Sequence, residues 1–170
     1  MELTNREIWT LIHGMIIGSL FLLAFAGGVA GLYSLRPQLV TTAGITERVR
    51  RLIFGTSAMA LLAWATVLTG TWIVYPWYRD KSPDSAKSIL LSDPSTANWH
   101  DFGMEWKEHI AWTAPMLATA AAFMVLYYRS ALARNKTARY ITITLFVAAF
   151  ATAAIAGLFG ALITKAAPVK

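Results

Sequence analysis

Four long stretches of the chain contain no Asp, Glu, Lys or Arg, and charged or turn-forming residues bound each of them. They cover residues 8–35, 52–78, 110–128 and 140–164 and are 28, 27, 19 and 25 residues long. A helix needs about 20 apolar residues to cross a bilayer. The pattern therefore predicts an all-α, integral membrane four-helix bundle, with helices at about 8–34, 51–78, 99–129 and 138–164.

These helices are expected to form one transmembrane domain over residues 1–170. The outer loop at 79–98 is the only long connection, and the other two connections are shorter. Asp93 followed by Pro94 is typical of an N-cap and first helical residue, so the third helix is also expected to begin near Pro94, before the membrane. Residues 85–91 are expected to add a short surface helix.

Composition supports a membrane protein and excludes a soluble domain. Hydrophobic residues make up 56% of the 170 residues and charged residues 14%, whereas a soluble domain carries about 25% charged residues. The chain has no Cys, which excludes disulfides, thiolate metal sites and Cys-linked haem.

The few charges are unevenly distributed between the two sides of the predicted bundle. The 1–2 and 3–4 connections hold 8 basic residues and 1 acidic residue, while the side with both termini and the 79–98 loop holds 7 basic and 8 acidic. Short cytoplasmic loops are enriched in Lys and Arg. Both termini are therefore expected on the periplasmic side of a bacterial inner membrane. The pI near 9.8 then reflects membrane orientation, and nucleic acid is not an expected partner.

Two histidines share one depth on the outer side. His13 lies four residues after Trp9, and His109 lies three residues after Trp106, which places each imidazole roughly 5–6 Å below an interfacial Trp. Ionisable residues within membrane helices usually face the bundle or a cavity. Six of the seven Trp also fall near this side, which indicates an aromatic anchor belt or a wall around a bound group.

Two imidazoles from different helices are suited to several tasks. They can be the axial ligands of one haem iron, since imidazole suits iron and helix bundles hold haem well. They can also bind a metal with Glu105 and Glu108, relay protons, contact a quinone, or serve as structural hydrogen-bonding groups. No pair of Glu-x-x-His sequences is present, which argues against a di-iron site.

The neighbours of the two histidines favour the haem hypothesis. Small residues leave room for a macrocycle: Gly14, Gly18 and Ala111. Aromatic residues are candidates to cover its faces: Trp106 and Trp112. Basic residues are candidates to bind propionates at the outer surface: Lys107, Arg79 and Arg6.

Three further residues near this site have secondary roles in the prediction. Met116 and Met104 are reserve ligands for the iron. His100 lies nine residues before His109, about 180° round a helix. It is therefore expected to face away from the His109 side and to be exposed to solvent or to contact a partner subunit.

The sequences around the two histidines, Trp9-x-x-x-His13-Gly14 and Trp106-Lys107-Glu108-His109, make the chain resemble four-helix membrane b-type cytochrome subunits of redox complexes. The resemblance covers the whole architecture, without a long shared motif. It implies one haem b near the outer face and electron exchange with quinol or periplasmic redox partners, within a complex of membrane and periplasmic subunits. Many such cytochromes carry a second haem on the other side, but this chain has no histidine there.

Two alternatives remain open, a cofactor-free structural or assembly subunit and a quinone-binding module. No catalytic residue is assigned, and a non-catalytic redox subunit is favoured over an enzyme. No buried Asp or Glu is expected in any span, which argues against a proton pump or ion-coupled transporter.

Overall fold

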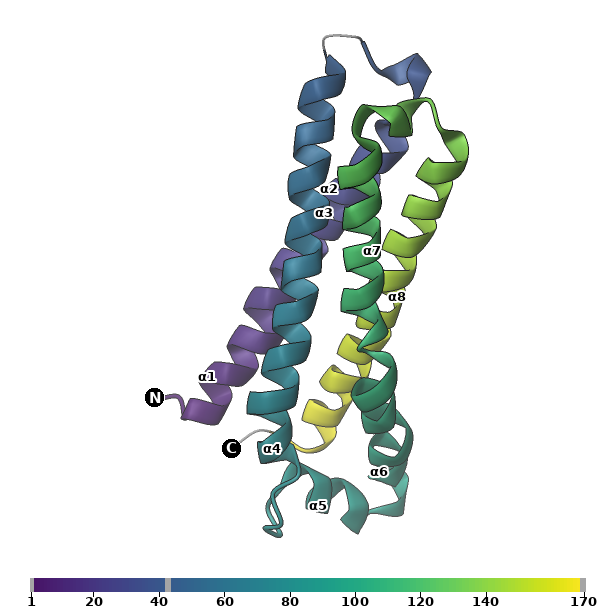
Figure 1. Cartoon of the computed structure of the whole chain (residues 1–170). Helices are drawn as coiled ribbons and strands as arrows, with labels where there is room; N and C mark the ends of the chain where they lie inside the picture. The colour runs from purple at the N-terminus through teal and green to yellow at the C-terminus, as the bar shows by residue number, and fades with distance from the viewer. Residues whose placement is uncertain (1, 42–43, 169–170) are drawn as a thin grey trace. The chain divides into compact units, whose positions relative to one another are not determined.

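The computed structural model describes residues 2–41 and 44–168, and within these residues every regular element is helical (Figure 1). The elements, in chain order, are α1 (Asn5–Leu11), η1 (Ile12–Ile16), α2 (Ile17–Ser34), η2 (Pro37–Leu39), α3 (Gly44–Thr69), η3 (Gly70–Val74), α4 (Tyr75–Tyr78), α5 (Ala86–Ser92), α6 (Pro94–Asn98), η4 (Trp99–Met104), η5 (Trp106–Ile110), α7 (Thr113–Tyr128), η6 (Arg129–Ala133) and α8 (Lys136–Ala166). The prediction of an all-α chain is confirmed.

Successive elements join into four helices that are long and apolar enough to span a membrane: Asn5–Ser34, Gly44–Tyr78, Pro94–Ala133 and Lys136–Ala166. An 18-residue window within each helix has a mean hydropathy of 2.2, 1.8, 1.6 and 2.2, respectively. Large apolar side chains face outward along them, including Leu23, Phe54 and Leu61, each at least 70% exposed. Such outward faces are suited to lipid.

The helices begin earlier than the apolar runs predict, because polar residues cap them outside the runs. Thr4 forms a capping box with Glu7, and Asn135 Oδ1 accepts a hydrogen bond from the backbone N–H of Ala138. Asp93 accepts from the backbone N–H of Ser95 at 2.8 Å, and this bond lowers the pKa of the Asp93 carboxyl. The helix start at Pro94 and the short helix in the outer loop, α5, agree with the prediction.

The contacts group the chain into two compact units, and each unit takes segments from all four long helices. Unit 1 contains residues 1–19, 65–112 and 152–170, and unit 2 contains residues 20–64 and 113–151. The 79–93 connection and the described residues nearest both termini therefore belong to one unit. The described parts of the other two connections belong to unit 2.

Unit 2 is held by close helix contacts and a buried cation. The α2 backbone at Gly28 approaches α3 at Gly55, as expected where small residues permit close packing. Phe25 on α2 stacks on Phe150 of α8, with ring centroids 3.9 Å apart. The buried Arg139 guanidinium donates to the carbonyls of Leu35, Leu132 and Ala133, which provides hydrogen-bond partners for carbonyls near helix C-termini.

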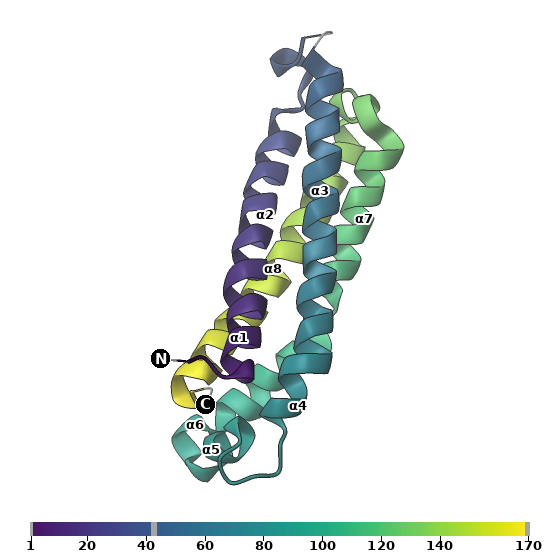
Figure 2. The same ribbon diagram turned by 90° about the vertical axis from the view of Figure 1, so that its left-hand side faces the viewer.

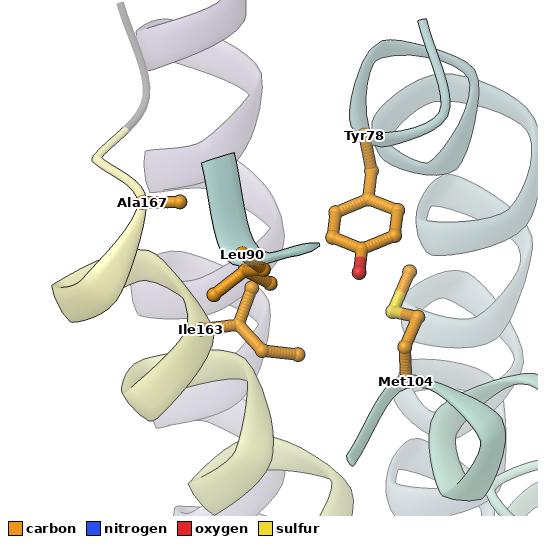
Figure 3. Packing of buried hydrophobic residues seen from close by; sticks show 5 residues of the cluster. All are labelled: Tyr78, Leu90, Met104, Ile163 and Ala167. Atoms are coloured by element: carbon orange, nitrogen blue, oxygen red, sulfur yellow. The ribbon is translucent and has the colours of Figure 1, made fainter. Parts of the chain in front are cut away.

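In unit 1, α5 lies beside α4 and the C-terminal part of α8 (Figures 1 and 2). A buried apolar cluster joins these segments and consists of Tyr78, Leu90, Met104, Ile163 and Ala167 (Figure 3). The outer loop is therefore folded onto the helix ends. All four π-helical turns of the described residues, η1, η3, η4 and η5, also fall in this unit.

Candidate functional site

All three histidines lie in unit 1, each on a π-helical turn: His13 on η1, His100 on η4 and His109 on η5. π-Helical turns are rare and are frequently found at functional sites. Three of the four π-helical turns in the described residues therefore carry a histidine.

His13 is partly buried and is held by the second span. Its Nδ1 lies 2.9 Å from Thr69 Oγ1, and that hydroxyl lies 2.7 Å from the Ala65 carbonyl oxygen. A carbonyl oxygen only accepts, so the single Thr69 hydroxyl hydrogen is directed to Ala65. The hydroxyl must then accept from His13 Nδ1–H. This assigns the Nδ1–H tautomer to His13 and leaves the lone pair on Nε2.

Gly70 on η3 leaves the space that this ring occupies. A Cβ atom at Gly70 would lie 3.1 Å from His13 Cε1 and 3.7 Å from Nε2, which is tighter than ordinary carbon contact. A side chain at this position would push the imidazole away from Thr69. Glycine at 70 and threonine at 69 therefore together fix the place and the tautomer of His13.

His109 is oriented in the same way by its own helix but has a different environment. Its Nδ1 lies 3.1 Å from the Glu105 carbonyl oxygen and 3.4 Å from Glu105 Oε2. Both oxygens only accept hydrogen bonds, so Nδ1 carries the proton and Nε2 the lone pair. The side chain is 70% exposed. The two predicted ligands thus share a tautomer, but His13 packs on the second span while His109 is exposed.

The exposure expected for His100 is wrong. His100 is only 8% exposed, and its Nδ1 lies 2.9 Å from the buried Tyr78 hydroxyl. The reason is that α4 and the folded outer loop cover this turn of the third span. The prediction that His100 and His109 face different ways agrees with their burial, because one is buried and the other exposed.

The small residues predicted beside the histidines border open space. A Cβ at Gly14 or Gly18 would meet no heavy atom within 4 Å. Ala111 is partly exposed, and its backbone N–H donates to the Trp106 carbonyl, which closes η5. The two glycines therefore do not serve close helix packing here.

The two predicted aromatic residues have different surroundings. Trp106 packs against Phe102 and Phe159, with ring centroids 6.3 and 6.2 Å away, and its buried Nε1 has no hydrogen-bond partner among the described residues. Trp112 meets Trp72 edge-on at 6.5 Å. Trp106 Nε1 is a buried donor without an acceptor, which is costly unless a bound group supplies one.

The three predicted cations have different contacts. Arg6 lies 3.6 Å from Asp80, and the Arg79 guanidinium lies 5.3 Å from the Tyr75 ring centroid. Lys107 points into unit 1 and lies over Gly160.

The reserve ligands differ in burial. Met104 is buried in the cluster of Figure 3, whereas Met116 on α7 is 57% exposed.

Glu108 is a half-buried acid of the third long helix. It lies within the third span, and its Oε1 is buried without a hydrogen-bond partner among the described residues. The carboxylate interacts electrostatically with Tyr75 and Tyr78 of α4. The helix predicted at about 99–129 includes Glu108, although the apolar run within it begins only at residue 110.

These features fit a haem in part. Four features are suitable for such a group: the lone pair on His13 Nε2, the space that Gly70 leaves for the His13 ring, the open space beside Gly14, and the unpartnered Trp106 Nε1. His13 and His109 have different partners, and no group of three or more His, Asp or Glu residues in the described part of the chain is arranged to hold a bare metal ion.

Comparisons with known proteins identify no relative: no family model, no curated protein and no solved structure matches the chain.

Proposed function

We propose that the chain is a membrane electron-transfer subunit that holds one b-type haem in unit 1, with His13 and His109 as axial ligands. A single observation carries the proposal: the Nδ1–H of His13 donates to Thr69 Oγ1, and the Nδ1–H of His109 donates to the Glu105 carbonyl oxygen. Metal-ligating histidines usually donate the other ring N–H in this way, which fixes the ring and raises the basicity of the ligating nitrogen. Tyr78 can both donate and accept, so its contact with His100 assigns no tautomer there.

The chain's own residues would bind and orient this group. Thr69 and Gly70 hold the ring of His13, and Glu105 holds the ring of His109. Of the three cations predicted to bind propionates, the proposal assigns Arg79 to them, because Arg6 and Lys107 line a separate cavity of unit 1. A bound haem supplies a one-electron iron couple, and the proposal assigns no catalytic residue to the chain.

The wider setting belongs to the same proposal. The basic 1–2 and 3–4 connections support a bacterial inner membrane orientation with both termini periplasmic. Unit 1 would then lie on the periplasmic side. Its partners would be membrane and periplasmic subunits of a redox complex, and quinol would be one source of electrons.

The test is the optical spectrum of the purified full-length chain, with a pyridine haemochrome assay after expression with haem supply. We expect the absorption of a low-spin b-type haem at one haem per chain. His13→Ala and His109→Ala should each abolish that low-spin spectrum, while His100→Gln, on the third histidine of the same unit, should keep it.

Two results would contradict the proposal in different ways. A folded but colourless preparation would refute haem binding and favour a cofactor-free structural subunit. An unchanged low-spin spectrum after His109→Ala, with its loss after His13→Ala, would remove His109 as a ligand and keep the site at His13.

A further inference from the structure

Unit 1 contains a cavity of about 420 Å³ that none of the features above occupies. Four members of the cluster in Figure 3, Tyr78, Met104, Ile163 and Ala167, lie on its wall. Its size is within the range of small-molecule sites, about 300–1,000 Å³. All of its lining residues belong to unit 1.

Lys107 is a cation on the cavity wall without an ionic partner among the described residues. Among the described residues, its ammonium has no carboxylate within ion-pairing distance and no hydrogen-bond partner. Gly160 makes room for it, since a Cβ at that position would lie 2.9 Å from Nζ. A partly buried cation without an anion is costly in a helix bundle, so an anionic ligand would be strongly favoured here.

The other polar groups of the wall define the ligand further. Arg6 is a second cation, and its only described partner, Asp80, lies 3.6 Å away at an exposed position. The hydroxyls of Thr10 and Thr164 donate to backbone carbonyls of their own helices. The cations are therefore the main donors available, and Asp84, an exposed residue, is the only acid on the wall.

We infer that this cavity binds a phosphate group, held by Lys107 and Arg6, with the remainder of the ligand against the apolar wall. Phosphate suits this arrangement because its oxygens reach two separate cations at once. In a membrane-spanning chain, helix ends lie near the phosphates of the lipid head groups, and basic pockets between spans bind the anionic ones. The apolar contacts of Val74, Met104 and Ile163 match the amphiphilic character of a lipid.

The test measures binding to the full-length chain in an uncharged detergent by native mass spectrometry and by the shift of the thermal unfolding midpoint. Three probes are compared: phosphatidylglycerol, phosphatidylcholine and inorganic phosphate. We expect phosphatidylglycerol to bind and raise the midpoint more than phosphatidylcholine does. Lys107→Gln should weaken phosphatidylglycerol binding about tenfold or more, as expected for a charge-assisted contact.

Matched variants keep the test decisive if Lys107→Gln fails to fold. Gly160→Ala retains the charge but displaces the flexible end of Lys107, so it should weaken binding without loss of the fold. Lys136→Gln removes a lysine of unit 2 and should leave binding unchanged. Stabilisation by inorganic phosphate equal to that by phosphatidylglycerol would identify a small phosphate as the ligand. Equal binding of the two lipids without any effect of phosphate, or binding that is unaffected by Lys107→Gln and Gly160→Ala, would overturn the inference.

Discussion

The hydrogen bond between Thr69 and His13 gives the sharpest test of the site. Thr69→Val preserves the shape of the side chain and removes the hydroxyl. The Ala65 carbonyl loses a bond of 2.7 Å, and His13 Nδ1–H loses its acceptor at 2.9 Å. A partly buried donor is then left without an acceptor in the protein.

The size of the effect follows from comparison with Thr56 on the same span. The Thr56 hydroxyl is buried and donates to the Leu52 carbonyl at 2.9 Å, with no partner outside its own helix. Thr56→Val removes only this local bond and is expected to change the free energy of unfolding little. Thr69→Val also leaves the imidazole unsatisfied, so it should cost about 1–3 kcal/mol more than Thr56→Val.

Two measurements check this reasoning. Titration of micellar protein with sodium dodecyl sulfate, followed by helical circular dichroism, gives the free energies of unfolding of the wild type and of both variants. Nitrogen NMR of ring-labelled histidine reports which nitrogen of His13 carries the proton. Equal losses for the two valine variants, or a proton on Nε2 of His13 in the wild type, would refute the tautomer and remove the support for His13 as a ligand.

Two further substitutions examine the packing of each unit in the same titration. Gly28→Ala places a Cβ 2.7 Å from Cε1 of the fully buried Phe146, so overpacking should cost about 1–3 kcal/mol, whereas the control Gly55→Ala meets nothing nearer than 3.9 Å and should not destabilise. Similar stabilities of these two variants would show that the helices separate easily at this point. Tyr78→Phe removes the hydroxyl 2.9 Å from His100 Nδ1 and should cost about 1–3 kcal/mol, and an unchanged stability would mean that the buried imidazole gains another partner.

The spans could be predicted from the sequence because absence of charge over 19 or more residues is a strong physical constraint. Their ends could not be predicted from apolar runs alone. Thr4 and Asp93 cap helices that begin in polar sequence, so the third span starts at Pro94, well before its apolar run. Asp93 followed by Pro94 did signal that start, because this pair has a local geometric meaning.

The inner and outer faces of the spans were harder to predict. In a membrane protein, both the lipid-facing and the interior side of a helix are apolar, so hydrophobic periodicity does not distinguish them. The angle between His100 and His109 separated the two residues correctly, but nothing in the sequence indicated which of them is buried. The outer loop decides this, because it folds onto the helix ends and covers His100.

The missed contacts involve residues of ordinary appearance. Thr69 and Gly70 lie in the middle of an apolar run, where threonine and glycine are common, and their role depends on the position of His13 on another helix. Gly160 likewise gains its meaning only from Lys107. Such pairs are set by tertiary packing between distant segments, which a single sequence does not encode in its spacing.

The distribution of the π-helical turns has a consequence for how the molecule moves. Unit 2 consists of α- and 3₁₀-helical elements in its described residues, whereas all four π-helical turns interrupt unit 1. Amide hydrogens near these turns should exchange with solvent faster than those of unit 2, because a π-helical turn interrupts the regular α-helical hydrogen-bond ladder. Local opening is therefore expected around the histidines of unit 1 rather than in the α-helical segments of unit 2.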